Sequence, residues 1–181
     1  RLDRNTAGLV LAAKDAATLR ELNRLIRENR IQKTYLCVLT ATPPKQTDIL
    51  HAYHWKDAKT NTVTISDHPK AGYREIITEY RVLQQQNGLC LAEITLHTGR
   101  THQIRAHMAH IHAPLAGDSK YGDRRKNESL HLKHQLLCAY QLQFHPEADS
   151  CLAYLNGKTV TAPLPDFVSR FFPTFSSKNR K

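Results

Sequence analysis

The sequence predicts an α+β domain built on a mixed, mostly antiparallel β-sheet with flanking helices. The chain has 181 residues, 40% of them hydrophobic, which is enough for one domain with its own core. Most of its strand-like runs follow one another closely and are separated by turn signals, as in hairpins. Only a few segments show the apolar period of a helix, so helices would flank the sheet rather than alternate with its strands.

The first half of the chain contains one long helix among several strands. Residues 8–13 form a short apolar run that is typical of a buried strand. Asp15 can cap a helix that runs to about Arg30. The apolar face of this helix would consist of Leu19, Leu22, Leu25 and Ile26. Its opposite face carries four arginines that would either be solvated or contact a polyanion: Arg20, Arg24, Arg27 and Arg30. Further strands are expected at 33–40, 49–55 and 62–65, with breaks at 43–44 and 70–72.

The second half begins with a predicted hairpin of strands 76–83 and 89–96, joined by the turn pair Asn87-Gly88. A helix is expected over 101–111, because Ile104, Met108 and Ile111 recur at its apolar spacing. A polar loop at 117–127 follows. The remaining elements are expected to be strands at 136–144 and 159–162 and a short helix at 165–171.

The composition indicates an anionic partner and an intracellular setting. Lys and Arg together number 26 against 16 acidic residues, a net charge of +10, which favours nucleic acid over a protein that is merely basic. No apolar run reaches the roughly 18 residues of a membrane span, so no membrane partner is expected. The four cysteines form no C-x-x-C pair, which fits a reducing cytoplasm. We expect one domain over 1–175, incomplete at its N-terminus because the chain starts on Arg1, and a basic disordered tail at 176–181.

Three polar segments are candidates for a functional site. In the first, residues 1–8, Asp3 lies between Arg1 and Arg4, which favour its ionised form. The second, residues 33–36, places Tyr35 near the start of a strand. The third, residues 99–107, combines a glycine turn with a helix start, where free backbone N–H groups can face an anion.

Together these segments resemble the RluA family of pseudouridine synthases. Residues 1–8 (RLDRNTAG) resemble its catalytic motif HRLDxxTSG, and Lys33-Thr34-Tyr35 resembles the motif of its active-site tyrosine. Residues 99–107 (GRTHQIRAH) resemble its motif GRTHQ[IL]RxH, and residues 117–122 continue the pattern. No histidine precedes Arg1, Ala7 stands at the usual serine, and Cys138 stands where the family often has histidine. The fully written third motif favours this family over the sister RsuA type.

The resemblance implies the fold of a pseudouridine synthase catalytic domain, here expected to lack its N-terminal strands. It also implies the isomerisation of specific uridines in ribosomal or transfer RNA. It implies Asp3 as the essential carboxylate, acting either on C1′ or on a ribose proton. Arg105 would pair with Asp3, and Tyr35 would stack on the uracil. Four residues are candidates for RNA contact: Arg1, Arg4, Arg100 and His102. Neither cofactor nor metal is expected, and we expect a monomer.

Two alternatives remain open at this level. Eleven histidines invite a metal site, but His102, His107, His110 and His112 lack the i, i+4 spacing of a zinc helix. The chain could also be a non-catalytic RNA-binding module, which its charge alone would allow. A binding module has no need for the combination of Asp3, Tyr35 and Arg105.

Overall fold

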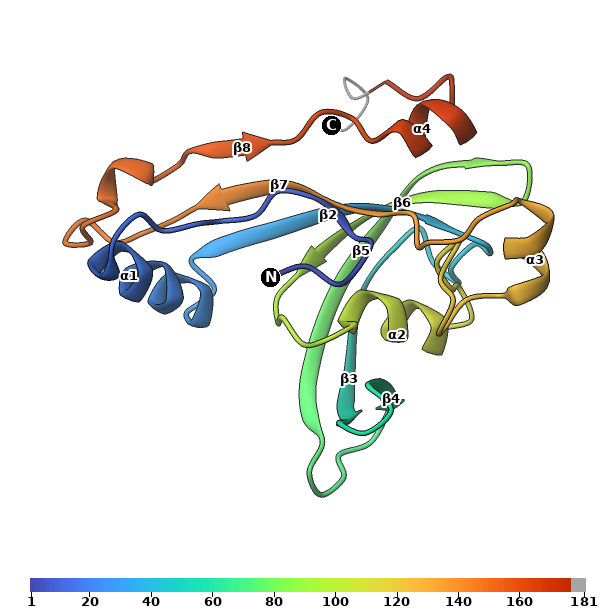
Figure 1. The fold of residues 1–181 in the computed structure, drawn as a ribbon, viewed down its shortest axis with the longest axis horizontal. Coiled ribbons are helices and arrows are strands. Elements are labelled where there is room, and N and C mark those ends of the chain that lie inside the picture. The colour runs from blue at the N-terminus through green and yellow to red at the C-terminus, as the bar shows by residue number, and fades with distance from the viewer. Residues whose placement is uncertain (177–181) are drawn as a thin grey trace.

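One eight-stranded sheet organises residues 1–176, which are the part of the chain that the computed structural model describes (Figure 1). Its strands are β1 (Ala7–Gly8), β2 (Ile31–Leu39), β3 (Thr47–Asp57), β4 (Thr62–Ser66), β5 (Arg74–Gln86), β6 (Leu89–Leu96), β7 (Leu137–Phe144) and β8 (Thr159–Thr161). The strand order is β1-β7-β2-β6-β5-β3-β4, and β8 also pairs with β7. Only the β1–β7 pair is parallel, so the predicted mixed, mostly antiparallel sheet is confirmed.

The described residues form four α-helices beside this sheet: α1 (Ala16–Arg27), α2 (Gln103–His110), α3 (Arg124–Ser129) and α4 (Asp166–Phe171). A short 3-10 helix covers Ala153–Leu155. In Figure 1, α1 and α2 lie on one side of the central strands and α4 lies on the other. Because side chains alternate along a strand, successive residues of β2 face the helices on opposite sides of the sheet. Cys37 and Leu39 pack with Ile104 of α2, whereas Leu36 and Val38 belong to the cluster of α4. No helix within 1–176 is both long and apolar enough to cross a membrane.

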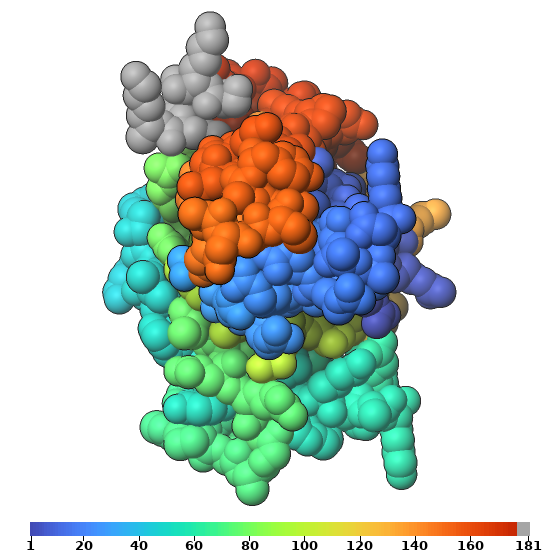
Figure 2. Space-filling model, turned by 90° about the vertical axis from the view of Figure 1, so that its left-hand side faces the viewer, coloured from blue at the N-terminus to red at the C-terminus, as the bar shows by residue number. Residues whose placement is uncertain are grey.

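A third apolar cluster lies at the end of the sheet under α1. Leu22 and Leu25 of α1 are buried there with Leu142, Phe144 and Leu152. Figure 2 shows this end of the molecule, where α1 lies against the segment between β7 and β8 and the β3–β5 hairpins project below it. The core on this side of the sheet is thus divided between a cluster under α1 and a cluster under α2.

The predicted buried strand at 8–13 is wrong. β1 contains only Ala7 and Gly8, both exposed, and Leu9 makes one further hydrogen bond to Ala139 before the segment leaves β7. Leu9 and Leu11 pack against the cluster under α1, while Val10 is 65% exposed. The apolar run therefore covers one side of the core as an extended segment, without continuing the ladder.

The predicted helix after Asp15 is confirmed, but it ends at Arg27 rather than Arg30. Asp15 caps it through the Thr18 N–H. The helix stops because Asn29 adopts a left-handed conformation (φ 55°) and the Arg30 N–H turns back to the Leu25 carbonyl. Of the predicted apolar face, Leu22 and Leu25 are buried, but Leu19 and Ile26 are 52% and 40% exposed.

Two of the four helix-face arginines are held in ion pairs. Arg24 contacts Glu21, Glu28 and Glu147, and Arg30 contacts Glu147.

The predicted polar loop at 117–127 is partly helical, because Asp123 caps α3 by accepting the Lys126 N–H. Of the tail predicted at 176–181, residues 177–181 lie outside the described residues.

Candidate active site

Arg105 of α2 joins two carboxylates from distant parts of the chain. Its Nε and Nη2 donate to Asp118 at 2.6 and 2.9 Å, and its Nη1 donates to Oδ2 of Asp3 at 3.3 Å. The side chain of Asp118 is fully buried and that of Arg105 is 6% exposed, whereas that of Asp3 is 23% exposed. The predicted Asp3–Arg105 pair is therefore present, but the closer partner of Arg105 is Asp118.

Arg105 and Asp118 each stabilise the charged form of the other. Burial alone would lower the pKa of Arg105, but the hydrogen bonds and charge of Asp118, followed by those of Asp3, raise it. Burial would likewise raise the pKa of Asp118, but the Arg105 guanidinium and two backbone N–H groups hold it below its usual value. Both side chains are therefore charged, and a fixed positive group stands beside Asp3.

The loop that carries Asp3 is fastened to the segment before β7. The Thr6 N–H donates to the Asp3 carbonyl at 3.0 Å and closes a turn, in which Asn5 has φ 66°. Gln135 donates from Nε2 to the Arg4 carbonyl at 2.6 Å and to the Thr6 hydroxyl at 3.2 Å. Gly8 ends this loop with φ 107°, and any Cβ there would overlap the Ala139 carbonyl. The backbone around Asp3 is thus held from both sides.

Gln103 fixes α2 to the sheet. Its Oε1 accepts the Arg100 N–H and the Thr98 hydroxyl, both at 3.0 Å. Its Nε2 donates to the Ile77 carbonyl at 3.1 Å and the Thr78 hydroxyl at 3.0 Å. One buried amide therefore ties the start of α2 to the turn after β6 and to β5, which determines where Arg105 lies.

Tyr121 contacts both the Arg105 guanidinium and the His102 ring. The Tyr121 ring centroid is 5.3 Å from Cζ of Arg105, within the range of a cation–π contact. The Tyr121 hydroxyl accepts the Val63 N–H at 2.9 Å and lies 2.9 Å from Nδ1 of His102. His102 is 8% exposed, and burial lowers its pKa, which favours the neutral imidazole.

Tyr35 faces the same side of the sheet as α2. It is partly buried against the apolar cluster under α2, at the β2 position that pairs with Ile94 of β6. Burial, and then the negative charge of Asp3, raise the pKa of Tyr35, so its hydroxyl stays protonated. The structure therefore brings Asp3, Tyr35 and Arg105 into one electrostatically connected site.

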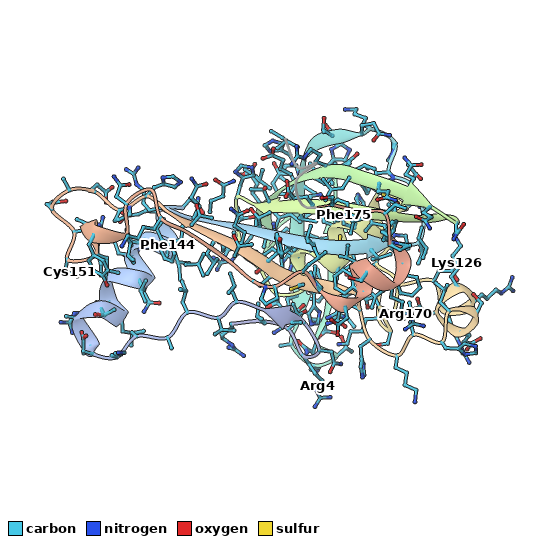
Figure 3. The ribbon with its side chains drawn as sticks, turned by 90° about the horizontal axis from the view of Figure 1, so that it is seen from above. Arg4, Lys126, Phe144, Cys151, Arg170 and Phe175 are labelled. Carbon is cyan, nitrogen blue, oxygen red and sulfur yellow. The ribbon has the colours of Figure 1, made fainter. Side chains whose placement is uncertain are left out.

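The other predicted site residues divide into two groups. Arg1, Arg4 and Arg100 are exposed, and Arg4 points away from the sheet in Figure 3. His102 is instead buried against Tyr121. Among residues 1–176, no group of three His, Cys, Asp or Glu side chains could hold a metal ion.

The sequence patterns predict no role for Asp118, Tyr121 or Gln103. Gly117-Asp118 and Tyr121-Gly122 continue the third motif, which is the available signal for the first two residues. Gln103 lies inside the same pattern, but its burial could not be read from the sequence.

A family model described as RNA pseudouridylate synthase matches residues 1–110. The chain belongs to this family. An uncharacterised RNA pseudouridine synthase of Chloroflexus aurantiacus is 35% identical over 166 residues, which cover 91% of this chain and 49% of that protein. Ribosomal large subunit pseudouridine synthase C of Buchnera aphidicola is 34% identical over 178 residues, covering 93% and 52%. The predicted RluA-type membership is confirmed, and the chain spans about half the length of these relatives.

Solved structures agree at the level of the fold. Human RNA pseudouridylate synthase domain containing 1 superposes with a TM-score of 0.71 at 23% identity, covering 92% of this chain and 67% of that one. Human RNA pseudouridylate synthase domain containing 4 gives a TM-score of 0.65 at 19% identity, covering 84% and 65%. The predicted pseudouridine synthase fold is therefore confirmed.

Proposed function

We propose that this chain is the catalytic part of an RNA pseudouridine synthase that isomerises specific uridines in ribosomal RNA, with Asp3 as the essential carboxylate. The observation that carries the proposal is the cluster of Asp3, Arg105 and Asp118. A ribosomal rather than a transfer RNA substrate is supported by the names of relatives from Buchnera aphidicola, Vibrio cholerae and Haemophilus influenzae. The cytoplasmic location and monomeric state stay predictions.

The reaction breaks the C1′–N1 bond of uridine and forms a C1′–C5 bond. The proton lost from C5 is balanced by one gained at N1, so no oxidant or imported group is required. Attack on C1′ and removal of a ribose proton both need an ionised carboxylate with a free oxygen. Arg105 occupies Oδ2 of Asp3, while Oδ1 has no hydrogen bond among the described residues. Asp3 is thus oriented by one oxygen and available through the other.

The remaining residues would hold the substrate. The uridine must leave its stack to reach Asp3, which costs a few kcal/mol when the base is paired. The net charge of +10 favours binding of the phosphate backbone and partly offsets this cost. Tyr35 offers a ring on which the uracil can stack, and burial followed by the charge of Asp3 raises the pKa of its hydroxyl, which stays protonated. Arg1, Arg4 and Arg100 remain candidates for phosphate contact.

The test is Asp3→Asn, which keeps the size of the side chain and removes its charge. We expect no tritium release from C5-labelled ribosomal RNA transcripts, while binding of the same RNA stays within about twofold of wild type. Asp67→Asn is the control, because Asp67 is 71% exposed and pairs only with His110 among the described residues. Tritium release by Asp3→Asn at the wild-type rate would reject Asp3 as the essential group. A wild-type protein that binds RNA but releases no tritium from ribosomal or transfer RNA would instead favour the non-catalytic module.

A further inference from the structure

Lys33 interrupts an otherwise apolar row on β2. The side chains of this strand that face α1 and α2 are Ile31, Lys33, Tyr35, Cys37 and Leu39. Ile31 belongs to the cluster under α1, and Cys37 and Leu39 belong to the cluster under α2. Lys33 therefore lies where the two clusters meet. It is the residue that precedes Tyr35 on this face of the strand.

The surroundings of Lys33 provide little to stabilise its charge. Its cross-strand neighbours are Leu96 of β6 and Leu142 of β7, both buried. Lys33 is partly buried, and this burial lowers its pKa. No hydrogen bond or ion pair to its ammonium group is found within residues 1–176. The Nζ atom at the tip of the Lys33 side chain lies beside Gly99, 3.5 Å from the place that a Cβ on Gly99 would occupy.

A partly buried ammonium group without a partner lowers the stability of the folded protein when no ligand is bound. Removing a charge from water costs free energy unless a counter-charge or hydrogen-bond acceptor replaces the water. Arg105 shows the opposite arrangement, because its guanidinium is more deeply buried and is paired with two carboxylates. The Lys33 ammonium therefore has no counter-charge among the described residues, and an anion from another molecule would stabilise its charge.

We propose that Lys33 binds a backbone phosphate of the substrate RNA beside the uridine that stacks on Tyr35. This inference rests on the proposed function, which supplies the RNA. Lys33 and Tyr35 lie on the same face of β2, about 7 Å apart along the strand, a separation comparable to the size of one nucleotide. Gly99 is exposed and has no side chain, so the ammonium can be approached from that side.

The direct test replaces Lys33 by methionine, which keeps the length of the side chain and removes the unpaired charge. We expect affinity for a ribosomal RNA segment that the wild-type protein modifies to fall about tenfold. The slope of log affinity against log salt should become shallower by about 0.7, the value for one lost phosphate contact on a single strand. The loss should appear in KM more than in kcat, and the melting temperature should not fall, since the substitution relieves a desolvated charge.

Lys45→Met is the matched control. It removes one charge from a lysine that is 65% exposed and paired with Asp48, so it should leave affinity and salt slope near wild type. An unchanged affinity and salt slope in Lys33→Met, with or without a loss of thermal stability, would overturn the proposal and assign Lys33 a structural role. A wild-type protein that modifies no RNA would overturn the proposed function instead.

A second measurement needs no variant. An amine-acylating reagent should modify Lys33 in the free protein, because its amine lies next to the exposed Gly99 and burial lowers its pKa. Mass spectrometry should find this modification suppressed when the RNA segment is bound, while modification of Lys45 is unchanged. Equal labelling of Lys33 with and without saturating RNA would contradict contact with a phosphate.

Discussion

Asp118→Asn is the substitution for which the structure gives the sharpest expectation. The amide keeps one oxygen, which can still accept the backbone N–H groups of Lys120 and Tyr121. Its other terminal atom becomes an NH₂ group that faces the Nε of Arg105 in place of the carboxylate oxygen now at 2.6 Å. Two donors then oppose one another at a place where both side chains are 6% exposed or less. The positive charge of Arg105 loses its principal partner without gaining contact with water.

Breaking a buried ion pair by removing one partner costs about 3–5 kcal/mol. Asp3 remains within 3.3 Å of Arg105, so we expect the lower end of that range, about 3 kcal/mol. For a domain of this size the corresponding fall in melting temperature is roughly 6–12 °C. Urea denaturation followed by circular dichroism would give the free energy of unfolding, and a thermal scan would give the second value.

Asp67→Asn serves as the comparison, since its side chain is exposed and its ion pair with His110 should add little to stability. Activity should fall as well, because an Arg105 released from Asp118 can move toward Asp3 and occupy both of its oxygens. A stability of Asp118→Asn within 1 kcal/mol of wild type would refute the argument that this carboxylate holds Arg105 in its charged, oriented state.

Gly8→Ala and His107→Gln test the scaffold, and Gly88→Ala is the control for the first. Gly8→Ala should lower the free energy of unfolding by about 2–3 kcal/mol, because its φ of 107° and its contact with Ala139 leave no room for a methyl group. Gly88→Ala, with φ 73° and no atom nearby, should cost only about 1 kcal/mol, and equal losses would contradict the steric reason. His107→Gln should flatten the dependence of stability on pH between about 6.5 and 4. Burial lowers the pKa of His107 from 6.5 to about 4 in the folded protein, so the unfolded chain takes up a proton first and wild-type stability falls as the pH drops through this window. Parallel pH profiles for the two proteins would show that His107 makes no such contribution.

The elements predicted most accurately are those specified by local signals. Asn87 and Gly88 both adopt positive φ angles, 52° and 73°, as the predicted two-residue turn between β5 and β6 requires. Asp15 caps α1 as predicted. The strand predicted over 8–13 was wrong because an apolar run has the same composition whether it pairs as a strand or covers a core without pairing. Which of the two occurs depends on whether another backbone lies alongside the run, and the local sequence carries no information about that.

The site shows the same division between local and long-range information. The motifs named Asp3, Tyr35 and Arg105, and the structure brings these three together. Asp118 was missed as the principal partner of Arg105 because it lies in a loop, where no periodicity indicates the direction of a side chain. Its bidentate contact with Arg105 depends on the way the loop after α2 folds back over the helix.

The third motif is specific because nearly every residue of α2 is buried, the polar ones included. Gln103 is satisfied by β5 and the turn before the helix, and His107 lies 3.0 Å from the Thr78 hydroxyl. Arg105 between them is satisfied by Asp118. Within residues 1–176, no buried side-chain nitrogen or oxygen lacks a partner. The polar groups of α2 therefore determine the position of the helix, and the helix in turn holds Arg105 against one oxygen of Asp3. The proposed role of Asp3 would therefore require a helix that begins a hundred residues further along the chain.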